Sequence, residues 1–349
     1  MQGGLLRSLV GDPEAEALFE DAADIDAMLS FEAALAAAEA NSGLIGTDAA
    51  AAIAAAVASF APDLPALERG MAKDGVVVPE LVRQLRRAVG APHESSVHLG
   101  ATSQDAVDTS LTLRLSRLIP LLDARLGDLL AALQRLADRH GAQPLTAHTR
   151  MQRAIPFTVA DKIVTWSAPL ERHRASLADL SPRLLVVQFG GPVGTRDGFD
   201  GKGDEVACRL AERLGLSVAP PWHSQRDGIV ALGSLISALS GSLGKVGADV
   251  ALMAQNEIGA ISIEGGGGSS SMPHKSNPVN AEALVGLARF NAGLCGALHQ
   301  AMVHENERSG AAWTLEWLTL PQMAVTTAAG LRLALALAGQ MSFPAGDRP

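Results

Sequence analysis

The sequence DAVDTSLTLRLSRLIPLLDARLGDLLAALQRLADRH, Asp105 to His140, decides the fold class of this chain. Leucine recurs in it every three or four residues, which is the spacing of one face of an α-helix. The leucines on this face are Leu111, Leu115, Leu118, Leu122, Leu126, Leu129, Leu133 and Leu136. Gly141 and Pro144 end the pattern. The stretch therefore predicts one long amphipathic helix.

Four further long apolar stretches follow this one along the chain. They cover residues 156–185, 227–263, 280–306 and 314–340. Alanine and leucine dominate the composition, aromatic residues make up 3%, and tyrosine is absent. Such a composition favours helix over sheet. We therefore predict an all-α fold with a bundle of five long helices.

The organisation of the chain changes near residue 105. Before it, three shorter helices are predicted over residues 24–44, 49–60 and 79–89. We expect an N-terminal helical domain over residues 1–104 and a central five-helix domain over residues 105–341. Residues 342–349 are expected to form a disordered tail.

The predicted helix over residues 227–263 is apolar on more than one face. Between Ala231 and Ala254 its only charged residues are Lys245 and Asp249. A helix that is apolar all round needs neighbours on every side. One chain with five such helices cannot easily supply them, so we predict a homo-oligomer with a helical bundle shared between chains.

Charge and cysteine content exclude several classes of protein. The net charge of −9 argues against a nucleic-acid partner, because basic patches supply most of that affinity. Cys208 and Cys295 form no disulfide framework and no zinc-ligand spacing. We see no signal peptide and no membrane span, so a cytoplasmic protein is expected.

Three polar stretches interrupt the helices. The first polar stretch is HLGATSQD, residues 98–105; the second is TAHTRMQRAIP, residues 146–156; the third is GGGGSSSMPHKSNP, residues 265–278. Each lies next to the start of a long helix, and a helix N-terminus attracts anions. Simpler alternatives are a helix cap made by Thr102, Ser103 or Asp105, an ordinary arginine-bearing surface loop, and a flexible linker, respectively.

The third polar stretch carries the most chemistry. Its four glycines prevent a helix from continuing and permit motion. Serines follow at residues 269–271, and Lys275 and Asn277 are suited to hold a carboxylate. A plain linker has no need of the sequence MPHKSNP.

The sequence GSSSMPHKSNPVNAE, residues 268–282, resembles the signature loop of the fumarase/aspartase superfamily. The first and second polar stretches resemble its other two signature regions, in the same order. Further stretches are most similar to the lactone-forming cycloisomerases within this superfamily: VVQFGGPVGT at 186–195, PWHSQRD at 221–227 and HENERSGAAWTLEW at 304–317. The resemblance extends from about Leu5 to Gln340.

This resemblance implies a homotetramer with a helical bundle at its centre and active sites that are each built from three subunits. It implies no metal and no organic cofactor. Its members commonly carry a further C-terminal helical domain, which is expected to be absent here. The implied reaction is the lactonisation of a polycarboxylate diene, in which a carboxylate of the substrate adds to a double bond.

The resemblance also implies roles for individual residues. Ser269 is the leading proton carrier, Ser270 is second, and His98 is the rival acid because histidine titrates near neutral pH. The residues expected to bind the substrate are Thr102, Ser103, Arg150, Gln152, Arg153, Arg226, Lys275 and Asn277. His223, Glu282 and Arg308 are weaker candidates that could equally be structural.

One position departs from the common pattern of the superfamily. Aligned on Gln152 and Pro156, Arg150 replaces the usual histidine and His148 lies two residues early. A histidine–carboxylate pair with Glu282 is therefore not expected. An arginine suits a substrate rich in carboxylates, because guanidinium binds carboxylate in bidentate fashion.

Three other functions remain open from the sequence. The same chemistry could act on a diene that carries a sulfonate, since arginines hold both anions. An elimination of the adenylosuccinate lyase type is a second alternative, against which Arg150 argues. A non-catalytic structural tetramer is the third, and the intact set of Ser269, Lys275 and Asn277 argues against it.

Overall fold

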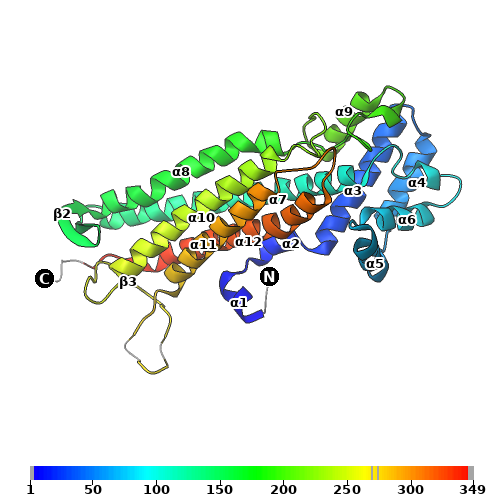
Figure 1. Cartoon of the computed structure of the whole chain (residues 1–349). Helices are drawn as coiled ribbons and strands as arrows, with labels where there is room; N and C mark the ends of the chain where they lie inside the picture. Colours follow the sequence, from blue (N-terminus) through cyan, green and yellow to red (C-terminus); the bar gives the residue numbers. More distant parts are fainter. Residues whose placement is uncertain (1–3, 269, 273–274, 345–349) are drawn as a thin grey trace.

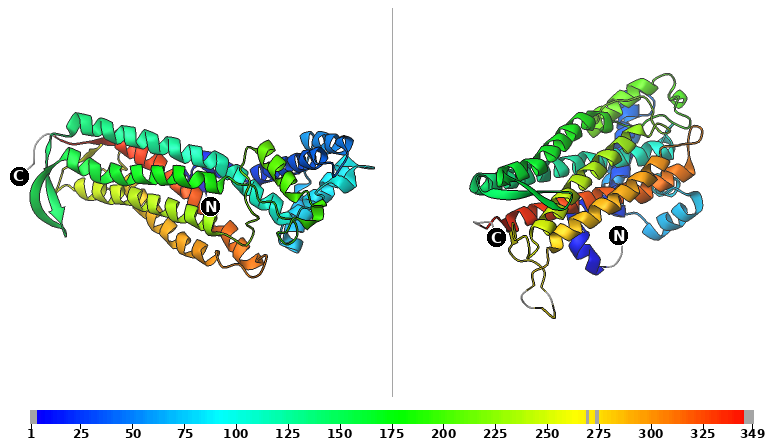
Figure 2. Two further views of the ribbon diagram at one scale, coloured as in Figure 1. Left: turned by 90° about the horizontal axis from the view of Figure 1, so that it is seen from above. Right: turned by 60° about the vertical axis from the view of Figure 1, so that its left-hand side comes forward.

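The computed structural model describes residues 4–344 except 269 and 273–274. Long helices lie alongside one another and form an elongated bundle, with a smaller group of helices at one end (Figure 1). Seen from above, the same two parts are distinct (Figure 2, left). The prediction of an all-α protein is confirmed, since the strands in the described residues are few and short.

In the described part of the chain the bundle consists of five long helices. They are α7 (Ser103–His140), α8 (Val159–Leu184), α10 (Asp227–Met253), α11 (Val279–Gln300) and α12 (Gly310–Gln340). The leucine face predicted for α7 lies in the core, where Leu115, Leu122 and Leu126 are fully buried. Its burial against the neighbouring helices holds the bundle together.

The smaller helical part has a core of its own. Its helices are α3 (Asp21–Asn41), α4 (Thr47–Ala58), α5 (Leu64–Asp74), α6 (Val78–Val89) and α9 (Gly203–Leu214), with short turns η1 (Glu94–Ser96) and η2 (Asp197–Phe199). Phe189, Phe199 and Leu210 pack in one cluster with Met28 and Phe31. A boundary at residue 104 therefore does not separate the two cores, because a later segment completes the smaller one.

The first residues of the chain belong to the bundle. Helix α1 (Gly4–Val10) and helix α2 (Pro13–Ala17) precede α3. Ala15 and Leu18 pack in the bundle core. The buried carboxylate of Asp12 accepts hydrogen bonds from Arg125 of α7. This ion pair ties the N-terminal segment to the bundle.

Two small β-structures lie at the end of the bundle away from the smaller part. Strands β1 (Pro144–Thr149) and β2 (Gln152–Thr158) form an antiparallel hairpin. The sequence predicted a loop up to residue 155 and a helix from residue 156, so residues 156–158 are strand instead of helix. Strand β3 (Ser262–Ile263) pairs with β4 (Met341–Ser342). The expected disorder from residue 342 is therefore wrong at its start, because Ser342 is paired and Phe343 is buried against His140.

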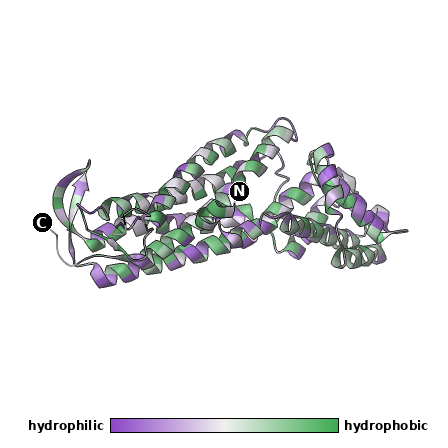
Figure 3. Cartoon of the chain, turned by 90° about the horizontal axis from the view of Figure 1, so that it is seen from below, coloured by the Kyte–Doolittle hydropathy of each residue, from purple (hydrophilic) through white to green (hydrophobic). Residues whose placement is uncertain are grey.

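Two of the bundle helices, α10 and α12, are long and apolar enough to cross a membrane by length and composition alone. Most of the apolar segment of each is buried inside the bundle, 56% in α10 and 72% in α12. Apolar residues run along all the bundle helices (Figure 3). Burial against neighbouring helices accounts for their hydropathy without a membrane.

Helix α11 is less covered than its composition would suggest. Only Ala281, Leu284, Leu287, Asn291 and Leu298 are buried among its residues. Phe290 is 43% exposed. A mostly apolar helix with so little buried surface leaves a face that another chain could cover.

Candidate active site

The first polar stretch places His98 beside a carboxylate of α3. The His98 Nδ1 atom lies 2.6 Å from Glu32 Oε1, and the two side chains are 12% and 2% exposed. His98 has a φ of 60°, which a residue with a Cβ adopts only at an energetic cost. Burial alone would lower the pKa of His98, but the Glu32 charge and hydrogen bond raise it above its usual value.

Asp105 fastens the start of α7 to a distant loop. Its buried carboxylate accepts hydrogen bonds from the backbone N–H groups of Thr102, Gly190 and Gly191, at 2.8–3.0 Å. It also accepts one from the Gln188 side chain at 3.0 Å. Asp105 therefore completes the capping box of α7 together with the N-cap residue Thr102, two of the three residues that the simpler alternative named. Thr102 and Ser103 are only partly buried, so both can contact a ligand beside the helix N-terminus.

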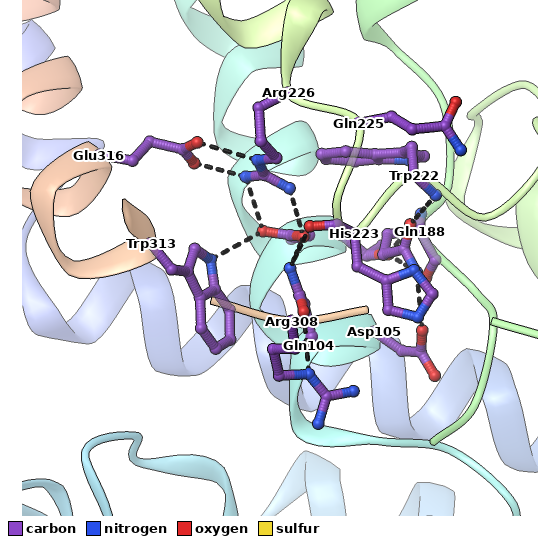
Figure 4. A network of polar contacts seen from close by, with 12 residues as sticks. Gln104, Asp105, Gln188, Trp222, His223, Gln225, Arg226, Arg308, Trp313 and Glu316 are labelled. Atoms are coloured by element: carbon purple, nitrogen blue, oxygen red, sulfur yellow. Dashed lines mark hydrogen bonds and ion pairs between the residues drawn. The ribbon is translucent and has the colours of Figure 1, made fainter. Parts of the chain in front are cut away.

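Arg226 does not lie where a substrate could reach it. Its side chain is fully buried between Asp108 and Glu316, with nitrogen–oxygen distances of 2.7 and 2.5 Å (Figure 4). The guanidinium also stacks on Trp222 at 4.8 Å. The prediction that Arg226 binds the substrate is therefore not supported, because both ends of its guanidinium are already occupied by carboxylates.

His223 and Arg308 belong to the same polar network. The Gln104 side chain donates a hydrogen bond to the His223 carbonyl oxygen and accepts one from Arg308 (Figure 4). His223 is 5% exposed, and burial lowers the pKa of its ring. Its ring packs closely against Gly194, where a Cβ would lie 2.7 Å from Cε1. These contacts give His223 a structural part, while Arg308 is exposed and can reach a ligand.

The second polar stretch is the hairpin. Arg150 and Met151 form its two-residue turn with φ of 48° and 66°, as hairpin loops of this length require. Arg150, Gln152 and Arg153 are all exposed. His148 is also exposed, and its ring Nδ1 lies 3.1 Å from the Thr146 carbonyl oxygen. The hairpin thus presents two guanidinium groups at the end of the molecule.

The third polar stretch is a loop whose two sides pair at its base, and we call this paired base, Gly267 with Asn277, the neck of the loop. Gly267 and Asn277 exchange backbone hydrogen bonds of 2.9 and 2.8 Å. A Cβ on Gly266 would lie 3.0 Å from the Asn277 carbonyl oxygen. Close approach of the two sides therefore requires glycine here, in addition to the freedom that the sequence suggested. Ser270 and Lys275 lie exposed beyond the neck.

Ser269, the leading candidate for the proton carrier, lies outside the described residues. Asn277 is partly buried, and its side chain donates a hydrogen bond to the Gly268 carbonyl oxygen at 3.4 Å. Glu282 is exposed in the first turn of α11. Its negative charge in the first turn favours the helix N-terminus.

One chain does not bring the three polar stretches together. The first lies at the N-terminus of α7, and the second directly follows the C-terminus of the same helix. A helix of 38 residues is roughly 57 Å long at about 1.5 Å per residue. The third projects from the bundle near β3, apart from the hairpin (Figures 1 and 2). A single site with all three stretches thus requires more than one copy of the chain.

Sequence reasoning missed Glu32, which is the nearest ionisable partner of His98. Glu32 stands in the apolar run of α3, where only its charge marks it as unusual. Glu39 lies two turns further along α3. Burial, with the Glu32 charge nearby, raises the pKa of Glu39 to about 9. A buried acidic residue in an apolar helix is the signal that could have identified both.

A family model described as "Lyase" matches residues 12–291. The chain is 43% identical to a 3-carboxy-cis,cis-muconate cycloisomerase of Pseudomonas aeruginosa, over 92% of this chain and 72% of that protein. It is 41% identical to the enzyme of the same name from Pseudomonas putida, over 93% of this chain and 79% of the relative.

The chain is also similar in three dimensions to a solved structure of an enzyme of this kind. The crystal structure of 3-carboxy-cis,cis-muconate lactonizing enzyme from Pseudomonas putida aligns with a TM-score of 0.92 and 40% identity. The alignment covers 98% of this chain and 78% of that one. The likeness therefore includes the bundle and the smaller helical part alike.

Proposed function

The chain belongs to the fumarase/aspartase superfamily of lyases, and on this premise we propose that it is a 3-carboxy-cis,cis-muconate cycloisomerase. The observation that carries this proposal is the identity of 41–43% to two enzymes of that name over more than nine tenths of the chain. The exposed arginines of the hairpin agree with it, because a tricarboxylate needs several cationic partners.

The reaction is an addition within the substrate. One carboxylate oxygen forms a bond to a carbon of a double bond, and the π electrons move to the carbon next to another carboxylate. That carbon takes up a proton from the enzyme, and solvent returns the proton. The trianion thus becomes a lactone dianion. The enzyme must hold the reactive conformer, stabilise the added charge on the carboxylate and supply the proton.

We assign the binding of the negative charge to all three polar stretches. Arg150 and Arg153 neutralise carboxylates that do not react. The residues that hold the carboxylate on which charge develops are Thr102, Ser103, Gln152, Lys275 and Asn277. Loss of one such donor typically lowers the rate by roughly 10²–10³.

Two groups can supply the proton. Ser269, with Ser270 as its neighbour, is one of them, and a serine is a weak acid without strong assistance. His98 is the other. The raised pKa of His98 keeps its ring protonated closer to neutral pH, which suits a proton donor.

We further propose a homotetramer in the cytoplasm, with each site built from three subunits. The separation of the three polar stretches along one chain supports this arrangement, and so does the uncovered apolar face of α11. Sulfonated dienes and adenylosuccinate are the alternative substrates. The relatives reported above favour neither.

The test is the ultraviolet absorbance of 3-carboxy-cis,cis-muconate mixed with purified protein, with the product identified by NMR. We expect the wild type to remove the diene band and form a lactone. The Ser269→Ala and His98→Asn variants are compared with Ser271→Ala, a change on the same loop outside the proposed site. A folded wild type that leaves the diene intact would contradict the substrate assignment, and the alternative substrates would then be tried.

Loss of activity in only one of the two variants identifies the proton donor. We expect Ser271→Ala to retain activity within about threefold, because its side chain has no assigned role. A Ser269→Ala variant with full activity would remove the loop serine from the mechanism and leave His98 as the donor.

A further inference from the structure

Glu32 and His98 form an isolated pair between α3 and the first polar stretch. The distance of 2.6 Å between Oε1 and Nδ1 is short for a hydrogen bond, as expected when one partner is charged. Glu32 is 2% exposed, and its other oxygen has no partner among the described residues. Among the described side chains, His98 is therefore the one hydrogen-bond partner of this carboxylate.

The pair fixes the orientation of the ring. With Nδ1 engaged by Glu32, the proton on that nitrogen is held and Nε2 is the end available to a ligand. His98 keeps 12% of its side chain exposed. The backbone is held as well, because Arg86 donates a hydrogen bond to the Val97 carbonyl oxygen at 3.0 Å.

Charged side chains from three helices act on the ring of His98. Helix α3 contributes the Glu32 carboxylate, α7 contributes Asp105, and α6 contributes Arg86. The two carboxylates favour the protonated ring, whereas Arg86 and burial oppose it. Glu39 lies further along α3 and is neutral near pH 7, because burial raises its pKa to about 9.

We infer that Glu32 is the positioning residue for His98, which it holds in the orientation and charge state of the acid that protonates the substrate carbon. This inference rests on the proposed cycloisomerase function. Glu32 touches no substrate, and its effect passes through the imidazole. His98 gives its Nε2 proton to the carbon next to a carboxylate as the carbon–oxygen bond of the lactone forms. Solvent then returns a proton to the ring.

The inference predicts a shift in the titration of His98. Replacing Glu32 by glutamine removes the charge that favours the protonated ring, so the pKa of His98 falls. A neutral His98 cannot donate the proton. The alkaline limb of the pH dependence of kcat/KM therefore moves to lower pH in Glu32→Gln.

Two measurements test this shift. The first follows the modification of the His98 peptide by diethyl pyrocarbonate against pH with mass spectrometry, and needs no substrate. The second is the pH profile of lactone formation. Glu39→Gln is the matched control, because it changes a buried acid on the same helix whose carboxyl oxygens have no hydrogen-bond partner among the described residues and which is not among the groups that shift the pKa of His98. We expect its modification midpoint and its alkaline limb to equal those of the wild type.

Kinetic parameters separate positioning from binding and from folding. We expect Glu32→Gln to lower kcat roughly 10²-fold with KM changed less than about threefold, since general acid catalysis contributes on that order. Glu32→Asp keeps the charge and should recover part of kcat and of the alkaline limb. His98→Asn and the double variant Glu32→Gln/His98→Asn should be equally slow, because one residue acts through the other.

An unchanged modification midpoint in Glu32→Gln overturns the inference, and so does a shifted midpoint with an unchanged alkaline limb. A double variant much slower than His98→Asn overturns it too. If Glu32→Gln does not fold, Glu32→Asp decides by its midpoint and kcat alone. A wild type that shows the His98 shift but leaves the diene intact would refute the proposed substrate instead, while the pairing of Glu32 with His98 would stand.

Discussion

At the scale of the residue, one side chain often carries more contacts than the sequence suggests. Asp105 was one of three residues that could cap α7, and its carboxylate accepts a hydrogen bond from the backbone N–H of the N-cap residue Thr102. The same carboxylate also holds the backbone of Gly190 and Gly191, which lie 85 and 86 residues further along the chain. Their N–H groups are paired because α7 and this loop pack together, and only the packing brings them within reach.

Arg226 provides the clearest prediction at this scale. Its removal leaves Asp108 and Glu316 buried without a positive partner. We expect Arg226→Met to lower the free energy of unfolding by roughly 3–5 kcal/mol, as measured by urea denaturation. The control is Arg209→Met, which breaks a half-exposed pair with Glu205 and should cost less than about 1 kcal/mol.

A substrate role for Arg226 would have a different signature. In that case Arg226→Met would unfold at the wild-type urea concentration and show a raised KM. This result would contradict the structural assignment, and it would restore the role that the sequence indicated for this arginine.

At the scale of the element, helix–helix spacing depends on glycines within the bundle. A Cβ on Gly244 would lie 2.5 Å from the Ala288 Cβ, and one on Gly247 would lie 2.9 Å from the Leu284 Cβ and closer still to the Ala281 carbonyl oxygen. Glycine lowers helix propensity, so its presence inside α10 has another cause. The cause is the close approach of α11.

We expect Gly247→Ala to destabilise the protein by roughly 1–3 kcal/mol, because overpacking outweighs the gain in helix propensity of about 1 kcal/mol. Thermal or urea unfolding measures this change. Gly339→Ala in α12 is the control, since no atom lies within 4 Å of its added Cβ. A Gly247→Ala variant as stable as Gly339→Ala would show that α10 and α11 can separate without cost.

The hairpin of β1 and β2 is the element that sequence reasoning missed. Its strands read PLTAHT and QRAIPFT, which do not alternate apolar and polar residues. Its turn is Arg150–Met151, which lacks the asparagine and glycine that usually mark a two-residue turn. Strand β1 directly follows α7, and β2 leads directly into α8.

At the scale of the whole molecule, the separation of the polar stretches is the main observation. His98 and Arg150 lie near opposite ends of α7. If both act on one substrate, they must come from different subunits. The composition of α10 and the uncovered face of α11 independently favour such an assembly.

Subunit mixing tests this arrangement. We expect His98→Asn and Arg150→Ala to be nearly inactive alone and to recover activity when they are unfolded and refolded together. Mixed tetramers would contain some sites with both native residues. The two variants mixed without unfolding form the control and should stay inactive. Mixed tetramers, verified by mass spectrometry, that show no activity would place both residues in the site of one subunit.

The sequence by itself determined the helical class, the long helices and the superfamily. Periodic leucines predict a helix from the local sequence alone, because they form one apolar face whichever helix packs against it. The signature stretches could be read as motifs because their residues are consecutive. The ends of the helices were predicted less accurately than their existence: α10 ends at Met253 instead of Ile263.

Only the tertiary structure decided which ionisable groups meet. Glu32 and His98 are 66 residues apart, and Arg226 and Glu316 are 90 apart. Such pairs depend on how helices pack, and packing is a property of the whole core rather than of a local pattern. The tertiary structure therefore places Arg226 in the core, between two buried carboxylates, and places the carboxylate of Glu32 beside His98.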